Sequence, residues 1–361
     1  MQVQRSTEED RPRRVLIVRT GAMGDVLHAM PAVAALRERH PDWFIGWAIE
    51  PGWSELLQSA GGGDGGMPLV DRWHGVSTRS WKQRPFSLET LRDINALRGE
   101  LRGEGYDVCV DMQGLIRSAV IGRMAGAEAF AGAAEPREAA AAWLYRQRGK
   151  LSAAHVVERG CELLGAAVGE TLRPAKVELP VDVAAERWCD ALLGGTGGEG
   201  FVMMAPTAGW GSKQWPAERY GAVAAELGRT GYRVLVNAAS AEDEVGRRVV
   251  AASGGAAGLL VCSIGELIAV MRRVALVIAG DTGPLHLAAA LGRPVAALYG
   301  PTDPARTGPY GTLSRMLRHG ESRVDHRRHA AAEAGLMQIG VEEVTAAAVE
   351  LLRAGRDKVT M

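Results

Sequence analysis

Short apolar runs alternate with segments of helical periodicity along the whole chain. Near the start, residues 14–19 form a β-branched run that enters a glycine-containing turn, and apolar residues then recur at helical spacing over residues 26–36. Further runs at residues 44–49 and 106–110 predict strands, and residues 88–101 predict a helix between them. This alternation favours a parallel sheet flanked by helices. We therefore expect an α/β domain in the first part of the chain.

The second half of the chain repeats this alternation. Strands are predicted at residues 201–205, 232–236, 259–262, 275–278 and 294–299. An extended stretch around residues 171–182 contains two prolines, and we place the domain linker there. The prediction is a first domain over residues 1–176 and a second over residues 177–361. The final helix, predicted over residues 341–354, could pack on either domain.

The composition is that of a folded protein in a reducing compartment. A chain of 361 residues, 47% apolar and 23% charged, favours two domains with a cleft between them. Lysine plus arginine and aspartate plus glutamate both number 42, so the overall charge gives no reason to expect a nucleic-acid partner. The four cysteines are widely spaced and form no C-x-x-C pair, which fits reduced thiols in a reducing compartment. With no signal-peptide pattern and no spanning segment, we expect a cytoplasmic protein with at most peripheral membrane contact.

Two strings that resemble known motifs are rejected as sites. Residues 61–66 satisfy G-x-G-x-x-G, but they follow a helix-like segment instead of ending a strand. His326 and His329 lack a nearby third ligand and are interpreted as part of a solvated basic loop. The chain contains neither a Walker A sequence nor a D-x-D pair. No metal and no cofactor are therefore expected.

The loop after the first predicted strand offers a candidate catalytic carboxylate. Residues 20–28 read Thr-Gly-Ala-Met-Gly-Asp-Val-Leu-His, which places Gly24 and Asp25 where the strand turns into a helix. Asp25 could be an ordinary helix N-cap, and spacing alone favours neither reading. As a carboxylate it could accept a proton from a sugar hydroxyl if a developing cation lies alongside.

A loop in the second half carries a lysine suited to a phosphate. Residues 206–216 follow a buried strand and place Lys213 just ahead of a helix start. A solvated lysine in a turn is the alternative. The position at the carboxyl end of a strand favours the functional interpretation.

Residues 280–286 form the strongest predicted phosphate cradle. Asp281, Thr282 and Gly283 end an apolar strand, and the helix that follows has free N–H groups that could hold a diphosphate. An N-cap role for Asp281 and a core position for His286 are the structural alternatives.

These motifs, in this order, resemble those of glycosyltransferase family 9, the bacterial heptosyltransferases, and in particular their type I. The resemblance rests on residues 20–28, 209–216 and 280–286 with the trailing Tyr-Gly-Pro-Thr-Asp-Pro at 299–304. It spans almost the whole chain and implies a GT-B fold, in which two Rossmann-like domains face each other across a cleft. It implies inverting, metal-independent transfer of heptose from an ADP-heptose donor, bound by the second domain, to the Kdo region of lipid A, bound by the first. No protein partner is implied.

The resemblance also assigns roles to residues. Asp25 matches the catalytic base, Lys213 matches the lysine that meets the donor phosphates during catalysis, and Glu242 resembles the acid that binds the donor ribose. A carboxylate suits that role because it accepts two hydroxyl hydrogen bonds, although a solvated acid at a helix start is nearly as good an interpretation of Glu242. The residues matching the diphosphate turn are Asp281, Thr282, Gly283 and His286. The chain departs from the type I pattern at Ala208, Gly209, Asn237 and Ala238.

Acceptor contacts are expected on the first domain. Residues 111–118, 136–138 and 155–159 resemble heptosyltransferase segments, and guanidinium groups bind carboxylates and phosphates bidentately. A single exposed arginine is more often a solvated surface group, but the clustering favours a site. The predicted acceptor residues are Gly24, Arg79, Lys82, Gln113, Arg117, Arg137 and Arg159.

Other functions stay open at this point. The chain could be a family 9 transferase with another donor or acceptor, as in a type II heptosyltransferase. It could also be a nucleotide-sugar epimerase or hydrolase, which would turn over the donor alone. A non-catalytic glycan-binding protein would bind a ligand saturably and transfer no sugar.

Overall fold

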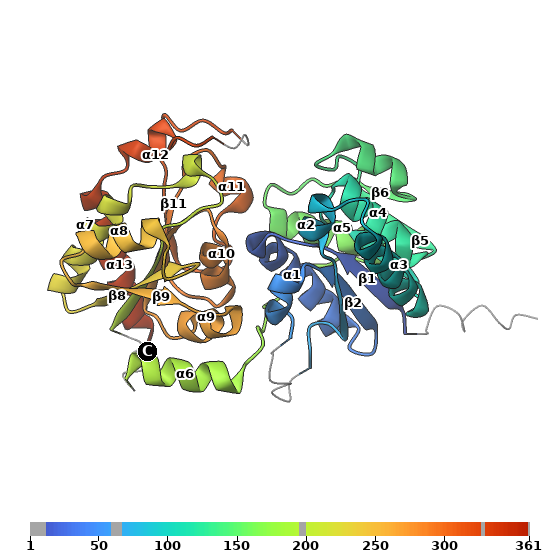
Figure 1. Ribbon diagram of the computed structural model, residues 1–361, viewed down its shortest axis with the longest axis horizontal. Helices are drawn as coiled ribbons and strands as arrows, with labels where there is room; N and C mark the ends of the chain where they lie inside the picture. The colour runs from blue at the N-terminus through green and yellow to red at the C-terminus, as the bar shows by residue number, and fades with distance from the viewer. Residues whose placement is uncertain (1–11, 59–66, 195–199, 326–328, 360–361) are drawn as a thin grey trace, which may run out of the picture. The chain divides into compact units, whose positions relative to one another are not determined.

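The computed structural model describes residues 12–58, 67–194, 200–325 and 329–359, with side chains described as far as Arg356. The glycine string at residues 61–66 and His326 lie outside these ranges. The chain divides into two compact units, and the boundary falls between Glu178 and Leu179. Each unit is a parallel sheet covered by helices (Figure 1).

The first unit contains a six-stranded sheet in the order β3-β2-β1-β4-β5-β6. Its strands are β1 (Arg14–Val18), β2 (Phe44–Ile49), β3 (Arg72–Gly75), β4 (Val108–Asp111), β5 (Ala129–Ala133) and β6 (Gln147–Gly149). Its helices are α1 (Met23–Arg39), η1 (Pro51–Leu56), α2 (Thr78–Gln83), α3 (Leu88–Gly103), α4 (Ile116–Ala125), η2 (Ala139–Leu144) and α5 (Val156–Val168). This is the Rossmann strand order, which reverses direction between β1 and β4.

The second unit repeats the same order, β9-β8-β7-β10-β11-β12. Its strands are β7 (Phe201–Ala205), β8 (Arg233–Ala238), β9 (Ala257–Val261), β10 (Leu276–Gly280), β11 (Val295–Leu298) and β12 (Ser314–Leu317). Its helices are α6 (Val183–Leu193), η3 (Gly211–Lys213), α7 (Ala217–Arg229), α8 (Glu244–Ala252), α9 (Ile264–Met271), α10 (Gly283–Ala290), α11 (Pro304–Thr307), α12 (Ala334–Gln338) and α13 (Val341–Val359). Here the order reverses between β7 and β10.

The apolar runs account for the central strands of both sheets. Residues 15–18 of β1 and residues 276–279 of β10 are completely buried, because helices cover both faces of a parallel sheet. The predicted α/β class of two Rossmann-like sheets is confirmed. Among the elements of the described residues, no helix has the length and apolarity needed to cross a membrane.

The last helix belongs to the core of the second unit. Val344, Ala348 and Leu351 of α13 are buried in the cluster that contains Trp215 and Tyr220. α13 contacts α7 and the strands β10, β11 and β12. The sequence left open which domain the final helix packs on, and the structure places it on the second unit.

Candidate active site

The predicted catalytic and donor loops lie at the two points where strand order reverses. The loop after β1 carries Asp25 and the loop after β4 carries Gln113, and these two strands are hydrogen-bonded neighbours. In the second unit, β7 and β10 are neighbours in the same way, and they are followed by Lys213 and Asp281. Ligands of doubly wound sheets bind at such points. Each unit therefore has a candidate site at the carboxyl ends of its first and fourth strands.

The Asp25 carboxylate is held between two arginines. Helix α1 begins at Met23, and its N-cap is Ala22, so Asp25 lies in the first turn and is not the cap. One carboxylate oxygen is 2.9 Å from Nη2 of Arg19 and the other is 3.3 Å from Nη1 of Arg137. The Asp25 side chain is 32% exposed, which leaves it open to a ligand. It has the position and the exposure that a base acting on a bound hydroxyl needs.

Gln113 holds the loop that precedes Asp25. Its side-chain carbonyl accepts a hydrogen bond of 3.1 Å from the Thr20 N–H, and its amide nitrogen donates one of 2.8 Å to the Gly21 carbonyl. Gln113 is itself buried. We infer that it positions the loop, and its direct contact with an acceptor stays a prediction.

A buried carboxylate, Asp111, in turn fixes the loop that carries Gln113. Asp111 accepts hydrogen bonds from the N–H groups of Gln113 and Gly114 and from the hydroxyls of Ser118 and Tyr145. Burial raises the pKa of Asp111, and these four hydrogen bonds oppose that rise by stabilising the charged form. A network of this kind rigidifies the carboxyl end of β4, and through Gln113 it also holds the loop ahead of Asp25.

The other predicted acceptor residues are spread over the first unit. Gly24 lies in the first turn of α1, and Arg137 contacts the Asp25 carboxylate, so these two belong to the Asp25 site. Arg79 and Lys82 are exposed on α2, Arg117 is exposed at the start of α4, and Arg159 is half-buried on α5. The acceptor roles of all these residues remain predictions.

Lys213, Asp281 and His286 form a buried charged cluster in the second unit. The Lys213 ammonium is 2.6 Å from one Asp281 oxygen, and Nε2 of His286 is 3.0 Å from the other. The three side chains are only 16%, 8% and 6% exposed. Burial by itself would raise the pKa of Asp281, but the hydrogen bond and charge of His286 and the charge of Lys213 outweigh it and hold that pKa well below its ordinary value. Asp281 is therefore an ionised anchor for both partners.

The N-terminus of α10 lies directly after this cluster. Its N-cap is Thr282, whose hydroxyl donates to the Gly280 carbonyl at 3.2 Å and does not cap the helix. Asp281 is not the N-cap either, because its carboxylate is bound to Lys213 and His286. The N–H groups of the first turn therefore have no side-chain cap, and a helix N-terminus of this kind favours an anion.

A segment from the C-terminal part of the chain holds the Lys213 turn in place. The Ser212 N–H donates to the His329 carbonyl at 3.0 Å, and the Glu333 N–H donates to the Ser212 carbonyl at 3.3 Å. A Cβ at Gly211 would overlap the Ala330 carbonyl. The position of Lys213 thus depends on contacts with a segment that lies more than a hundred residues later in the sequence.

We expect Gly211→Ala to destabilise the protein and to weaken binding of ADP, the nucleotide of the donor that the family resemblance predicts for Lys213. The added methyl group must displace backbone at residue 330, which typically costs about 1–3 kcal/mol in the free energy of unfolding. Gly209→Ala is the matched control, since a Cβ there meets no atom within 4 Å. Chemical denaturation and calorimetric ADP titration measure both effects. Equal stability and affinity of the two variants would contradict the packing described here.

Glu242 lies on an exposed loop after β8. The next residue, Asp243, is the N-cap of α8, and its carboxylate also lies 3.5 Å from the Thr207 hydroxyl in the loop after β7. Capping is therefore done by Asp243, and Glu242 is left exposed at the carboxyl edge of the sheet. This position is compatible with a ribose ligand and equally with a solvated acid, so its role remains a prediction.

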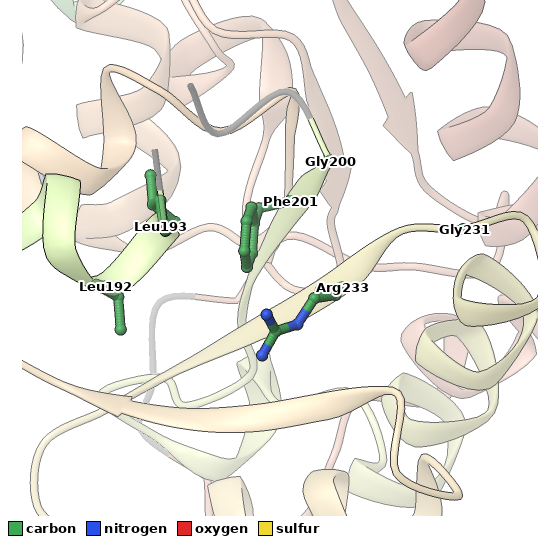
Figure 2. A pocket seen from close by; sticks show the side chains of 7 residues that line it. Leu192, Leu193, Gly200, Phe201, Gly231 and Arg233 are labelled. Atoms are coloured by element: carbon green, nitrogen blue, oxygen red, sulfur yellow. The ribbon is translucent and has the colours of Figure 1, made fainter. Parts of the chain in front are cut away.

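A pocket of about 440 Å³ lies at the amino ends of two strands of the second sheet, opposite the carboxyl ends that carry the predicted site residues. Figure 2 shows it between the first residues of two strands, Phe201 of β7 and Arg233 of β8, and the end of α6 at Leu192 and Leu193. The Arg233 guanidinium lies 5.3 Å from the centre of the Phe201 ring. Because this pocket is at the amino ends of the strands, none of the predicted site residues lines it.

Comparison with known proteins identifies a family for this combination of fold and residues. The model of glycosyltransferase family 9 (heptosyltransferase) matches residues 94–335. Lipopolysaccharide heptosyltransferase 1 of Escherichia coli K12 is 31% identical over 309 residues, which cover 84% of this chain and 93% of that protein. Lipopolysaccharide heptosyltransferase 2 of the same organism is 30% identical over 127 residues, or 33% of this chain and 36% of that protein.

A solved structure extends the similarity to the whole fold. E. coli heptosyltransferase WaaC with ADP-2-deoxy-2-fluoro heptose superimposes with a TM-score of 0.72 at 26% sequence identity. The superposition covers 93% of this chain and 99% of WaaC. The similarity therefore includes both Rossmann-like units.

Proposed function

Because the chain belongs to glycosyltransferase family 9, we propose that it transfers heptose from ADP-heptose to the Kdo region of lipid A, with inversion and without a metal. The chain is a glycosyltransferase by family, and its similarity to heptosyltransferase 1 supports heptose transfer in lipopolysaccharide synthesis. The observation that carries the finer proposal is the Lys213, Asp281 and His286 cluster beside the uncapped start of α10, together with the partly exposed Asp25 of the first unit.

The donor proposal rests on the positive groups of the second unit. WaaC binds an ADP-heptose analogue, and this chain is similar to WaaC along nearly its whole length. Here the ammonium of Lys213 and the N–H groups of α10 supply fixed positive charge for a diphosphate. Such preorganised charge can stabilise a leaving diphosphate in place of a divalent ion. Glu242 is proposed to bind the ribose.

The proposed chemistry is a single displacement. The acceptor hydroxyl oxygen forms a bond to the anomeric carbon, the bond from that carbon to the ADP oxygen breaks, and the hydroxyl proton passes to Asp25. One displacement inverts the anomeric configuration. Arg19 and Arg137 hold the carboxylate by its two oxygens, and the exposed Arg137 can also meet an anionic acceptor sugar.

The proposed acceptor is that of heptosyltransferase 1 because that relative matches more of the chain than heptosyltransferase 2 does. Heptosyltransferase 1 matches 84% of the chain, whereas heptosyltransferase 2 matches 33%. Exposed basic residues of the first unit, among them Arg79, Lys82 and Arg117, suit the carboxylates and phosphates of Kdo-bearing lipid A.

The test is an assay of the purified chain with ADP-heptose and Kdo-bearing lipid A in the presence of a chelator. We expect ADP release that requires the acceptor, and an acceptor heavier by one heptose. ADP release without acceptor would indicate a hydrolase or epimerase instead. Transfer only to an acceptor that already carries heptose would indicate a type II enzyme, and transfer abolished by the chelator would contradict metal independence.

A further inference from the structure

The ammonium of Lys213 lies near an aromatic ring as well as near a carboxylate. Its Nζ atom is 5.0 Å from the centre of the Trp210 ring. The same atom is 2.6 Å from a carboxylate oxygen of Asp281 and 3.4 Å from the Asp281 carbonyl. Within the part of the chain that the structure describes, Asp281 supplies both oxygen partners of this ammonium. Trp210 is therefore the second group that the ammonium meets.

The distance between the Lys213 ammonium and the Trp210 ring is that of a cation–π interaction. The electron-rich face of an indole attracts a cation within about 6 Å of the ring centre, and tryptophan is the strongest aromatic partner of this kind. The attraction grows when the cation loses water, and the Lys213 side chain is only 16% exposed. The ring therefore replaces part of the hydration that burial takes from the ammonium.

The backbone fixes the position of Trp210 relative to the lysine. Trp210 is the N-cap residue of η3, with an extended backbone, and the Lys213 N–H donates to its carbonyl at 3.2 Å. Gly211 lies between the two and has no room for a side chain. The Gln214 side-chain amide donates to the Ala208 carbonyl at 3.2 Å, which ties the two ends of the loop together. The ring and the ammonium thus belong to one fixed turn.

An aromatic partner leaves the Lys213 ammonium able to bind an anion. An ammonium has three N–H donors, and the Asp281 carboxylate takes one of them at 2.6 Å. A second carboxylate in place of the Trp210 ring would take another donor, and its charge would repel a diphosphate. The ring attracts the ammonium through its π face, which carries no net charge. The lysine therefore keeps positive charge for a ligand although its side chain is largely buried.

We propose that Trp210 is a positioning residue that holds the Lys213 ammonium where the donor diphosphate binds. This inference rests on the proposed function, because it names what keeps the lysine of that same site in place. Trp210 acts through the lysine and is not itself a catalytic residue. Direct contact of the ring with the nucleotide, and simple packing of the ring, are the two alternatives.

The test is a double-mutant cycle between Trp210 and Lys213. Trp210→Leu keeps an apolar side chain without the ring, and Lys213→Met removes the ammonium. In the wild-type background, Trp210→Leu should weaken binding of ADP and of inorganic pyrophosphate by about threefold to thirtyfold. In the Lys213→Met background, the same change should cause no further loss of affinity. Trp210→Phe should lie between the wild type and Trp210→Leu, because phenylalanine has a weaker π face.

Calorimetric titration measures these affinities, and denaturant unfolding measures the stability of each variant. Trp188→Leu is the matched control, since Trp188 on α6 is another half-buried tryptophan of the second unit and lies outside the site. If Lys213→Met unfolds too easily for titration, the cycle is measured in Lys213→Met/Asp281→Asn, which removes the lysine together with the charge that it neutralises.

Three results would overturn the inference. Equal losses of affinity in the two backgrounds would assign the Trp210 ring a direct ligand contact or a packing role. Unchanged affinity in Trp210→Leu would exclude any role, and equal affinities of the Phe and Leu variants would exclude the π face. Failure of the proposed function is distinct, because the wild type would then bind neither ADP nor pyrophosphate. The cycle on the free energy of unfolding still tests the contact in that case, and the absence of coupling between Trp210 and Lys213 would refute it.

Discussion

Asp25→Asn is expected to reduce heptose transfer by about a hundredfold to ten-thousandfold while ADP affinity stays at the wild-type value. The amide keeps the size of the side chain but cannot take the acceptor proton, and general-base catalysis contributes about this much to a rate. ADP affinity should not change, because the Lys213, Asp281 and His286 cluster belongs to the other unit. Single-turnover rates and calorimetric ADP titration measure the two quantities.

The control for this variant is Asp93→Asn, which changes an exposed aspartate on α3 of the same unit. The pair with the exposed Arg137 contributes at most about 1 kcal/mol. Arg19 is only 12% exposed, but it also donates to the backbone carbonyls of Asp25 and Met112, so it keeps acceptors and folding should survive. Transfer by Asp25→Asn at the rate of Asp93→Asn would exclude Asp25 as the base. A melting temperature lowered only in Asp25→Asn would instead assign it a structural role.

Lys213→Met is expected to lower transfer by about a hundredfold to a thousandfold and also to destabilise the second unit. Removal of one donor to a developing anion costs about 3–4 kcal/mol of barrier. The same change removes a partner 2.6 Å from the buried Asp281 carboxylate, and breaking a buried ion pair costs about 3–5 kcal/mol. Steady-state kinetics and denaturant unfolding measure the two effects.

The double variant Lys213→Met/Asp281→Asn separates the two roles of the lysine. Neutralising Asp281 removes the buried charge that has lost its lysine partner, so stability should return toward the wild type while transfer stays low. If the lysine served only to neutralise Asp281, transfer would return together with stability. Arg248→Met/Glu218→Gln is a matched control, because it removes an exposed ion pair of the same unit.

The sequence predicted most of the central strands of both sheets because those strands are buried on both faces. Each predicted strand is present with ends within two residues of the prediction. The strands that went unpredicted are β3, β5, β6 and β12, and three of these are at sheet edges. An edge strand needs less apolar sequence, and β6 reads only Gln-Arg-Gly, which carries no strand pattern.

The candidate sites were predictable as loops but not as sets of contacts. Strand ends and glycines located the loops of Asp25, Lys213 and Asp281. Arg19 follows β1 and pairs with Asp25 in the first turn of α1. The signal for this pair in the sequence was an arginine six residues ahead of the aspartate. The Tyr145 hydroxyl beneath Asp111 had no local signal, because the two residues meet only through the sheet.

The hydrogen bonds between Ser212 and residues 329 and 333 determine when the Lys213 turn can fold during synthesis. The His329 carbonyl and the Glu333 N–H bond to Ser212, so the turn can take its final form only after residue 333 has left the ribosome. The first unit ends at Glu178 and can fold long before that point. During synthesis, the Asp25 carboxylate can therefore reach its folded position before the Lys213 turn does. A chain truncated before residue 329 would retain the Asp25 site but lack the hydrogen bonds that hold the Lys213 turn.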